Sequence, residues 1–260
     1  MSEIHPSAIV SERARLAEDV SVGPFSIIDA GVEIGPGSVI GAHAWITGSS
    51  KLGKNNTVGY GTIIGADPQD TSFEVETGSN VEIGDDNVIR EYVTIHRSAA
   101  EGASTSVGHS NFLMTGVHLA HDVQMGSHNV LANNVLVAGH VKMADHVFLG
   151  GGSAFHQFIH IGQYAIVQGN AVVSRDVPPY CMGHGRNELA GLNVIGLRRG
   201  GFPPEERADI KRAYQLLFRS GGNMSESLAE ADKSTWTDVA KHLLHSARHS
   251  SRKGMMSRSS

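Results

Sequence analysis

The sequence has few of the features that mark a disulfide-stabilised, membrane-spanning or nucleic-acid-binding protein. Its single cysteine, Cys181, excludes an internal disulfide framework and a metal site with several thiolate ligands. Charged residues make up only 18% of the 260 residues and the formal net charge is −5, which argues against general nucleic-acid binding. The chain has no apolar run of membrane-spanning length and no signal peptide. We therefore expect a cytoplasmic protein with no membrane span.

Glycine and histidine, in contrast, are abundant. The 31 glycines favour many turns over long helices, because glycine adopts backbone conformations that other residues avoid. Many of the 15 histidines lie in the middle third of the chain. Neutral imidazole is the side chain best suited to proton transfer near pH 7, so this region is the first place to search for chemistry.

An aliphatic residue recurs every six positions over most of the chain. The first series is Ile4, Val10, Leu16, Val22, Ile28, Ile34, Ile40, Ile46, Leu52, Val58 and Ile64. A helix repeats its apolar residues near every 3.6 positions and a strand every two, so a period of six fits neither alone. It is typical of hexapeptide repeats, in which short strands and turns wind into a parallel β-helix with three hexads in each coil. We therefore predict a mainly β fold, a hexapeptide-repeat solenoid.

Two polar stretches interrupt the period. The first, 66–80, shifts the phase by one residue, and the second, 97–106, preserves it. From Val107 to Val173 the period then runs without a slip. We predict that both stretches are loops leaving a corner of the solenoid, where irregular segments on a rigid scaffold often carry function.

We predict that the chain divides into a solenoid over residues 1–185 and a helical domain over 186–260. The hexads end near Pro178-Pro179, because consecutive prolines break a strand, and 183–201 is predicted to be a linker. Pro203-Pro204 is typical of a helix start.

Two further helices follow in the predicted helical domain. Asn223 with Glu226 resembles a capping box, and Thr235 with Asp238 is predicted to cap a third helix. Residues from His249 onward are predicted to form a frayed tail.

The unbroken phase places several polar residues together. Residues 18 apart lie above one another in such a solenoid, so His121, Gly139 and Gln157 form one column. Asp122 and His140 begin the next column. His156 falls one position before the first column, and His118 lies on the same coil as His121. The period therefore predicts a cluster of imidazole, carboxylate and amide groups on one strip of surface.

Three interpretations of this cluster compete. The histidines could simply stack, or three imidazoles on an edge could bind zinc, although neither a cysteine nor an acidic cluster completes a tetrahedral set. The third is general-base catalysis by His121, with Asp122 orienting the imidazole and stabilising its charged form. Gly139 leaves its backbone N–H open to approach, as an oxyanion donor requires. No serine or cysteine nucleophile stands out beside the cluster, which favours direct transfer of a group between two substrates over a covalent intermediate on the protein.

These residues also carry a family resemblance. The segments 89–97, 118–122 (HLAHD), 131–134, 138–141 and 156–158, together with 176–180 and 192–202, resemble the UDP-N-acetylglucosamine O-acyltransferases of lipid A biosynthesis. The resemblance covers nearly the whole chain. It implies a left-handed parallel β-helix that works as a homotrimer with sites between subunits. It also implies transfer of an (R)-3-hydroxyacyl chain from acyl carrier protein to the 3-hydroxyl of UDP-N-acetylglucosamine, the first step of that pathway.

The resemblance also assigns roles to individual positions. His121 would be the general base, Asp122 its partner and Gly139 the oxyanion donor. Substrate-binding positions would be Gln69, Asp70, His118, His140, His156, Gln157, Asn193 and Arg199. Gly169 matches the family's acyl-length position, and a glycine there favours a longer chain. No metal and no cofactor is expected beyond the phosphopantetheine of acyl carrier protein, an acidic partner that would meet the basic residues of the helical domain.

Two departures from the family pattern bear on the acceptor. Ser72 stands where the family usually has a lysine, and Gly200 where it often has a third basic residue. An acceptor with a 3-amino group therefore stays open, as does a γ-carbonic-anhydrase-like metal-binding or purely structural solenoid. The related N-acyltransferases usually carry a domain before their hexads. Since the hexads here begin at Ile4, we expect the O-acyltransferase.

Overall fold

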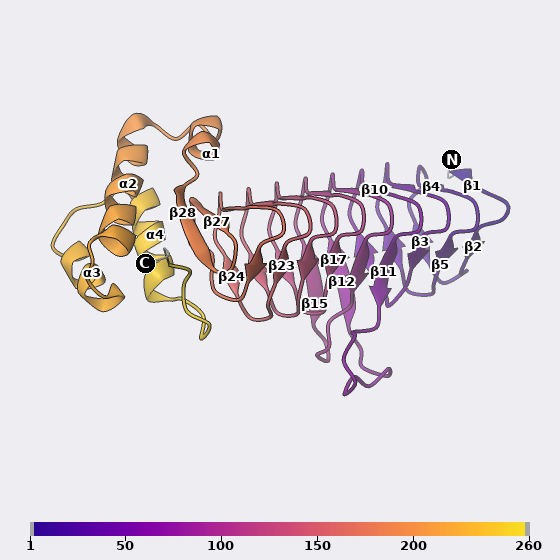
Figure 1. Cartoon of the computed structure of the whole chain (residues 1–260). Helices are drawn as coiled ribbons and strands as arrows, with labels where there is room; N and C mark the ends of the chain where they lie inside the picture. Colours follow the sequence, from indigo (N-terminus) through magenta and orange to yellow (C-terminus); the bar gives the residue numbers. More distant parts are fainter. Residues whose placement is uncertain (1–2, 258–260) are drawn as a thin grey trace.

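The computed structural model describes residues 3–257 as a three-sided β-solenoid with a helical region at its carboxyl-terminal end (Figure 1). From β1 to β23, each short strand pairs in parallel with the strand three further along the chain. In the unbroken part these partners are 18 residues apart, as in Leu113 beside Leu131. The predicted period and its coil length are therefore confirmed.

Within these residues the strands form three sheets, one on each side of the prism. Sheet 1 contains β1 (Glu3–Ile4), β4 (Ser21–Val22), β7 (Val39–Ile40), β10 (Thr57–Val58), β13 (Val88–Ile89), β16 (Phe112–Leu113), β19 (Val130–Leu131), β22 (Phe148–Leu149), β25 (Ile166–Val167), β27 (Cys181–His184) and β28 (Glu188–Leu192). Sheet 2 contains β2 (Ile9–Val10), β5 (Ile27–Ile28), β8 (Trp45–Ile46), β11 (Ile63–Ala66), β14 (Thr94–His96), β17 (His118–Leu119), β20 (Leu136–Val137), β23 (Ala154–Phe155) and β26 (Val172–Val173). Sheet 3 contains β3 (Arg15–Leu16), β6 (Glu33–Ile34), β9 (Lys51–Leu52), β12 (Asn80–Ile83), β15 (Ser104–Val107), β18 (Gln124–Met125), β21 (Lys142–Met143) and β24 (His160–Ile161).

The aliphatic residue of each hexad points into the prism. Leu113, Leu131 and Leu149, stacked on three successive coils, are fully buried. Small residues four positions later, such as Ser26 and Ala44, are also buried where the chain turns a corner. Burying a leucine side chain contributes about 1.5–3 kcal/mol, so a continuous column of them holds the coils together.

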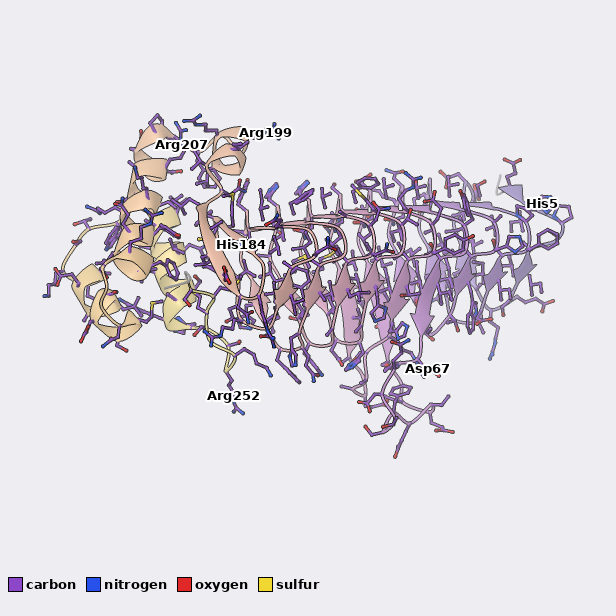
Figure 2. All side chains as sticks on the ribbon, in the orientation of Figure 1. His5, Asp67, His184, Arg199, Arg207 and Arg252 are labelled. Carbon is purple, nitrogen blue, oxygen red and sulfur yellow. The ribbon has the colours of Figure 1, made fainter. Side chains whose placement is uncertain are left out.

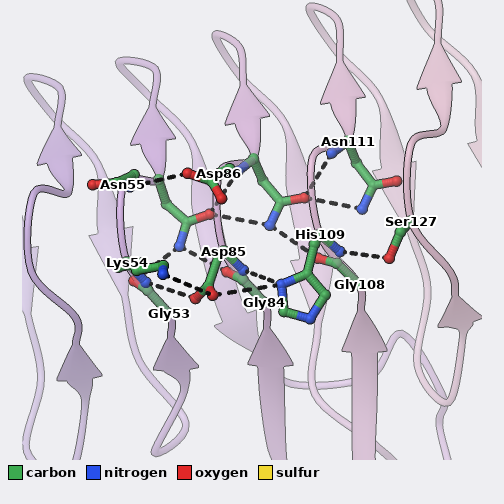
Figure 3. Close-up of polar contacts among 12 residues, drawn as sticks. Gly53, Lys54, Asn55, Gly84, Asp85, Asp86, Gly108, His109, Asn111 and Ser127 are labelled. Atoms are coloured by element: carbon green, nitrogen blue, oxygen red, sulfur yellow. Dashed lines mark hydrogen bonds and ion pairs between the residues drawn. The ribbon is translucent and has the colours of Figure 1, made fainter.

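An amide ladder closes one corner of the prism, and the sequence pattern does not predict it. The side-chain amide of Asn87 donates to Asn56 Oδ1 at 3.0 Å, and that of Asn111 donates to Asn87 Oδ1 at 2.9 Å (Figure 3). On the outer side of this corner, His109 Nδ1 accepts a hydrogen bond from the backbone N–H of Asp85. Buried amides that pair with one another satisfy their own hydrogen-bonding groups, so this ladder fixes the corner.

The two polar interruptions form loops at the edge where sheet 2 passes to sheet 3 (Figure 1). They are shorter than predicted, spanning 67–79 and 97–103, because Asn80 and Ser104–Ser106 belong to strands. We call residues 67–79 the acceptor loop, because it carries Gln69 and Asp70, to which the family resemblance assigns substrate binding. Both loops leave the prism close to the histidine cluster.

The chain after Pro178-Pro179 differs from the prediction. The segment 183–201 is not a linker. β27 pairs in parallel with β25, β27 and β28 form an antiparallel hairpin across the predicted boundary at residue 185, and α1 (Val194–Arg199) follows. The sheet continues because the strand resumes two residues after the prolines, at Cys181.

Three more helices complete the described fold: α2 (Pro204–Arg219), α3 (Met224–Ala231) and α4 (Asp238–Arg248). The capping box of Asn223 and Glu226 is confirmed. The prediction for Thr235 is wrong, because Thr237 is the cap of α4 and accepts from the backbone N–H of Ala240.

The predicted frayed tail is ordered as far as the structure describes it. Met256 is fully buried, and Ser251 donates to the buried carboxylate of Asp176. Residues 258–260 lie outside the described part. None of the helices within 3–257 is both long and apolar enough to cross a membrane.

Candidate active site

The predicted cluster lies where three successive coils turn from sheet 2 towards sheet 3. His121 and Asp122 follow β17, Gly139 follows β20, and His156 and Gln157 follow β23. A groove with a volume of 760 Å³ runs along this face. Of the predicted positions, Gln69, His118, His121, Gly139, His156 and Gln157 line it.

The centre of the site is a hydrogen bond between His121 and Asp122. The distance from His121 Nδ1 to Asp122 Oδ2 is 2.8 Å. Because a carboxylate only accepts, the proton of the neutral imidazole must lie on Nδ1, which leaves Nε2 free to accept another proton. Both side chains are mostly buried, with exposed fractions of 16% and 12%. The arrangement therefore suits a general base, because Nε2 can accept a proton while the carboxylate orients the ring.

Asp122 is held as a carboxylate by its surroundings. Burial raises the pKa of Asp122, but hydrogen bonds from Ser98, from His121 and from the backbone N–H of Ala99 outweigh it, and the net pKa is lowered. His140 Nε2 lies 3.7 Å from the same carboxylate. Asp122 also has a positive φ of 60°, a conformation that aspartate tolerates better than most residues. The charge that would stabilise an imidazolium at His121 is thus present at neutral pH.

Gly139 lies directly against the ring of His121. A Cβ atom at Gly139 would lie 2.8 Å from both Cε1 and Nε2 of His121. Within residues 3–257, the backbone N–H of Gly139 donates to no acceptor. The absence of a side chain therefore lets His121 approach and leaves a donor available beside its free nitrogen.

His118 forms the inner wall of the groove as a neutral ring. Its Nδ1 lies 2.7 Å from Thr94 Oγ1, and its ring packs edge-on against His96. Burial, together with neighbouring His96 and His121, lowers the pKa of His118 to about 4. His118 therefore offers a neutral hydrogen-bonding group at physiological pH.

This pKa has a consequence for stability. The neutral His118 favours the folded state fully above pH 6.5, its unperturbed value, and that contribution is lost as the pH falls towards about 4. We expect His118→Asn to lose less stability than the wild type between pH 6.5 and pH 4, when unfolding by urea is followed at several pH values. Equal losses in the two proteins would contradict the assignment.

The remaining predicted positions lie outside the groove of a single chain. Gly169 lies in the turn before β26, at the opposite edge of sheet 2 from His121. Asn193 caps α1 and its amide donates to the backbone carbonyl of Tyr164, so both ends of its side chain are used. Arg199 is exposed on α1, far along the prism from Asp67 of the acceptor loop (Figure 2).

Asp70 lies in the acceptor loop, next to the groove-lining Gln69. Ser72 donates to Asp70 Oδ1 from its backbone N–H at 2.9 Å and from its hydroxyl at 2.7 Å. The pKa of Asp70 is lowered, first by the backbone hydrogen bond from Ser72 and then by its hydroxyl. Ser72 therefore fixes the orientation of the aspartate.

Sequence reasoning missed several groups at this site. Ser174 and Arg186 line the groove, and Ser98 bonds Asp122. Ser174 directly follows Val173, where the period ends, and lies 18 residues after His156, so the period does predict its place in the column of His156. Ser98 and Arg186 lie in segments without the period, where spacing gives no signal.

One family model matches residues 13–48, described as a bacterial transferase hexapeptide of six repeats, and defines the class of this solenoid. A second, described as domain 2 of UDP N-acetylglucosamine O-acyltransferase, matches residues 176–256. The chain is 42% identical over 249 residues to the acyl-[acyl-carrier-protein]–UDP-N-acetylglucosamine O-acyltransferase of Herminiimonas arsenicoxydans, covering 94% of both chains. It is 43% identical to that of Halorhodospira halophila over 229 residues, covering 87% and 88% of the two chains.

The solved structure of the UDP-N-acetylglucosamine acyltransferase from Francisella novicida superposes with a TM-score of 0.91 at 37% identity, covering 98% of this chain and 94% of that one. The chain belongs to the family of UDP-N-acetylglucosamine O-acyltransferases.

Proposed function

We propose that the protein transfers an (R)-3-hydroxyacyl chain from acyl carrier protein to the 3-hydroxyl of UDP-N-acetylglucosamine, the first step of lipid A biosynthesis. Family membership across nearly the whole chain supports the activity. The observation that carries the mechanism is the His121–Asp122 hydrogen bond, beside a free backbone N–H at Gly139. The ligand atoms of His121, Asp122 and His140 lie within 4.8 Å of one another and could also hold a metal ion. Metal analysis of the purified protein tests this alternative, because stoichiometric zinc would overturn the proposed mechanism.

The reaction proceeds by direct attack in this proposal. Nε2 of His121 accepts the proton of the 3-hydroxyl while the oxygen attacks the thioester carbonyl. The imidazolium is stabilised by Asp122, and the backbone N–H of Gly139 donates to the oxyanion. Collapse of the tetrahedral intermediate breaks the C–S bond, and His121 returns the proton to the departing thiolate. No acyl-enzyme forms.

The substrates occupy the groove and its rims. We propose that Gln69, Asp70, His118, His140, His156 and Gln157 bind the sugar nucleotide and the donor near the reacting atoms. The acyl chain crosses sheet 2 towards Gly169, where the absent side chain leaves room for a longer chain. Asn193 caps α1, and Arg199 contacts the nucleotide bound in the site of a neighbouring subunit. A cytoplasmic location agrees with a carrier-protein donor.

A basic pocket in the helical region provides a docking surface for the acidic carrier protein. A cavity of 400 Å³ is lined by Arg198, Arg207, Lys211 and Arg219 over an apolar floor that includes Leu197. Clustered cations in a chain of net charge −5 create a local positive field, which raises the encounter rate with an acidic partner.

The outward faces of the prism support a homotrimer. Many exposed side chains on sheets 1 and 2 are apolar, including Val39, Phe148, Trp45 and Leu136. The outward column of sheet 3 carries charges instead, as in the ion pair of Arg15 with Glu33 (the next two residues of the column are Lys51 and Glu82). Two different apolar faces on one subunit are what a closed ring with a heterologous interface requires.

We expect Phe148→Glu to dissociate this trimer, because a carboxylate would be buried against an apolar face without a partner. Light scattering after gel filtration should give three times the 27.6 kDa chain mass for the wild type and one chain for the variant. Gln124→Glu, on the outward column of sheet 3, is the matched control and should stay trimeric. A trimeric Phe148→Glu would place the interface elsewhere.

The acceptor is tested by kinetics with paired substrates. Purified protein is assayed with carrier-protein thioesters of graded chain length and with either UDP-N-acetylglucosamine or its 3-amino analogue. We expect the hydroxyl acceptor to have the higher kcat/KM and the longer chains to be preferred. Preference for the amine would assign the Ser72 and Gly200 departures to a different acceptor.

A further inference from the structure

Arg97 holds the acceptor loop from inside. Its guanidinium donates from Nε to Asp67 Oδ1 at 2.8 Å, from Nη2 to the carbonyl of Val75 at 2.8 Å, and from Nη1 to the carbonyl of Thr77. The Arg97 side chain is only 10% exposed. One buried guanidinium therefore contacts both ends of the loop. The single ammonium group of a lysine could not make these contacts at the same time.

Apart from the Arg97 contacts, the acceptor loop is tied to the rest of the solenoid near its carboxyl-terminal end, where Gly78 donates to Glu101 and the hydroxyl of Ser79 donates to the carbonyl of Ser98. Most of residues 70–77 are exposed, and Phe73, its one partly buried aromatic, packs against the same guanidinium at 4.8 Å from the ring centre. Segments with few buried apolar side chains open locally at low cost. The position of Gln69 and Asp70 at the groove thus depends on Arg97.

The next two residues in the chain hold the catalytic carboxylate. Ser98 is fully buried, and its hydroxyl donates to Asp122 Oδ1. The backbone N–H of Ala99 donates to Asp122 Oδ2 at 3.2 Å. His121 Nδ1 is hydrogen-bonded to Oδ2 of the same carboxylate, so both carboxylate oxygens of Asp122 accept hydrogen bonds.

We propose that the Arg97–Ser98 dipeptide is a positioning strap that fixes the acceptor loop and the His121–Asp122 pair relative to each other. Arg97 positions the loop for the acceptor, and Ser98 positions the carboxylate for proton transfer. Neither touches substrate. The inference rests on the proposed function for its kinetic consequences, while its structural consequence stands apart from that function.

Arg97→Lys tests the first half of the strap. It keeps the charge near Asp67 but loses the contacts to the two carbonyls. We expect KM for the sugar nucleotide to rise by about tenfold or more, since charge-assisted hydrogen bonds of this kind are worth at least that factor. KM for the acyl donor should change by less than about twofold. Arg15→Lys, in an ion pair on an early coil, is the matched control and should change neither constant.

Asp67→Asn separates the ion pair from the carbonyl contacts. Asp67 is 48% exposed, and ion pairs with an exposed member contribute little. We expect its KM for the sugar nucleotide to rise less than that of Arg97→Lys. If KM for the sugar nucleotide rises equally in both variants, the ion pair and not the carbonyl contacts holds the loop, which would overturn this part of the proposal.

Ser98→Ala tests the second half. We expect kcat to fall by about tenfold with KM for the sugar nucleotide unchanged, and Ser98→Thr to restore most of kcat by returning the hydroxyl. If the Arg97 and Ser98 variants lose thermal stability but keep both kinetic constants, the role is only structural and the proposal is wrong.

Hydrogen exchange distinguishes failure of the strap from failure of the proposed function. Arg97→Lys should exchange faster than the wild type in residues 67–79, with the rest of the solenoid unchanged. Uniform or unchanged exchange would overturn the strap even if the enzyme is active. Faster exchange confined to the loop would support the strap even if the wild type acylates neither acceptor.

Discussion

Replacing His121 with alanine should abolish nearly all turnover while leaving the proposed trimer and the thermal unfolding of the protein close to the wild type. General-base catalysis contributes about 10²- to 10⁴-fold. Of the three histidines that line the groove in the described residues, His121 alone is hydrogen-bonded to a carboxylate. The side chain is 16% exposed and packs on a corner rather than in the core, so its loss costs little stability. kcat measured with saturating donor and acceptor is the test.

His109→Ala is the matched control for this experiment. His109 occupies the same position in its turn as His121 but lies at another corner, beside Asp85. Its variant should keep the wild-type kcat. A fully active His121→Ala would remove His121 from the mechanism, whereas equal losses in both variants would indicate a general effect on the fold.

Gly139→Ala should lower kcat by about 10²-fold, although the substitution keeps the backbone N–H. The added Cβ would lie 2.8 Å from the His121 ring, closer than real contacts, so the ring must move. Displacing a reacting group by about 1 Å can cost that factor, because the geometry of attack is lost. The backbone of Gly139 does not have a positive φ, so alanine itself introduces no conformational strain.

Gly222→Ala makes the same chemical change outside the site. Gly222 follows α2, and a Cβ there would lie 3.2 Å from the flexible end of Glu226 and at ordinary contact distance, 3.8 Å, from the hydroxyl of Ser220. It should match the wild-type kcat. If Gly139→Ala is equally active, the close approach of the ring to Gly139 does not matter for catalysis.

Much of the site follows from the sequence because one period controls both burial and position. An aliphatic residue every six positions fixes the inward direction, and an unbroken phase then stacks His121 on Gly139 without any tertiary information. The six-residue period does not predict the contacts made in the two loops that interrupt it. Arg97 and Ser98 act through loops whose course is set by their own hydrogen bonds, and no spacing predicts these.

The carboxyl-terminal errors have a similar physical origin. Two prolines interrupt a strand locally. Pro179 lies in a turn, after which β27 begins at Cys181 and pairs with β25. Met256 returns to the solenoid through contacts that join residues far apart in sequence. The helix start at Asn223 was predicted correctly, since a capping box is a local feature, whereas the cap of α4 was placed two residues too early.

The most direct test of the proposed function is the identity of the product. Purified protein is incubated with (R)-3-hydroxyacyl carrier protein and UDP-N-acetylglucosamine, and the sugar nucleotide is then analysed by mass spectrometry and NMR. The account predicts one added hydroxyacyl group, joined as an ester at the 3-oxygen, formed by the wild type and not by His121→Ala. A sugar nucleotide that stays unacylated, or one that His121→Ala acylates equally well, would contradict it.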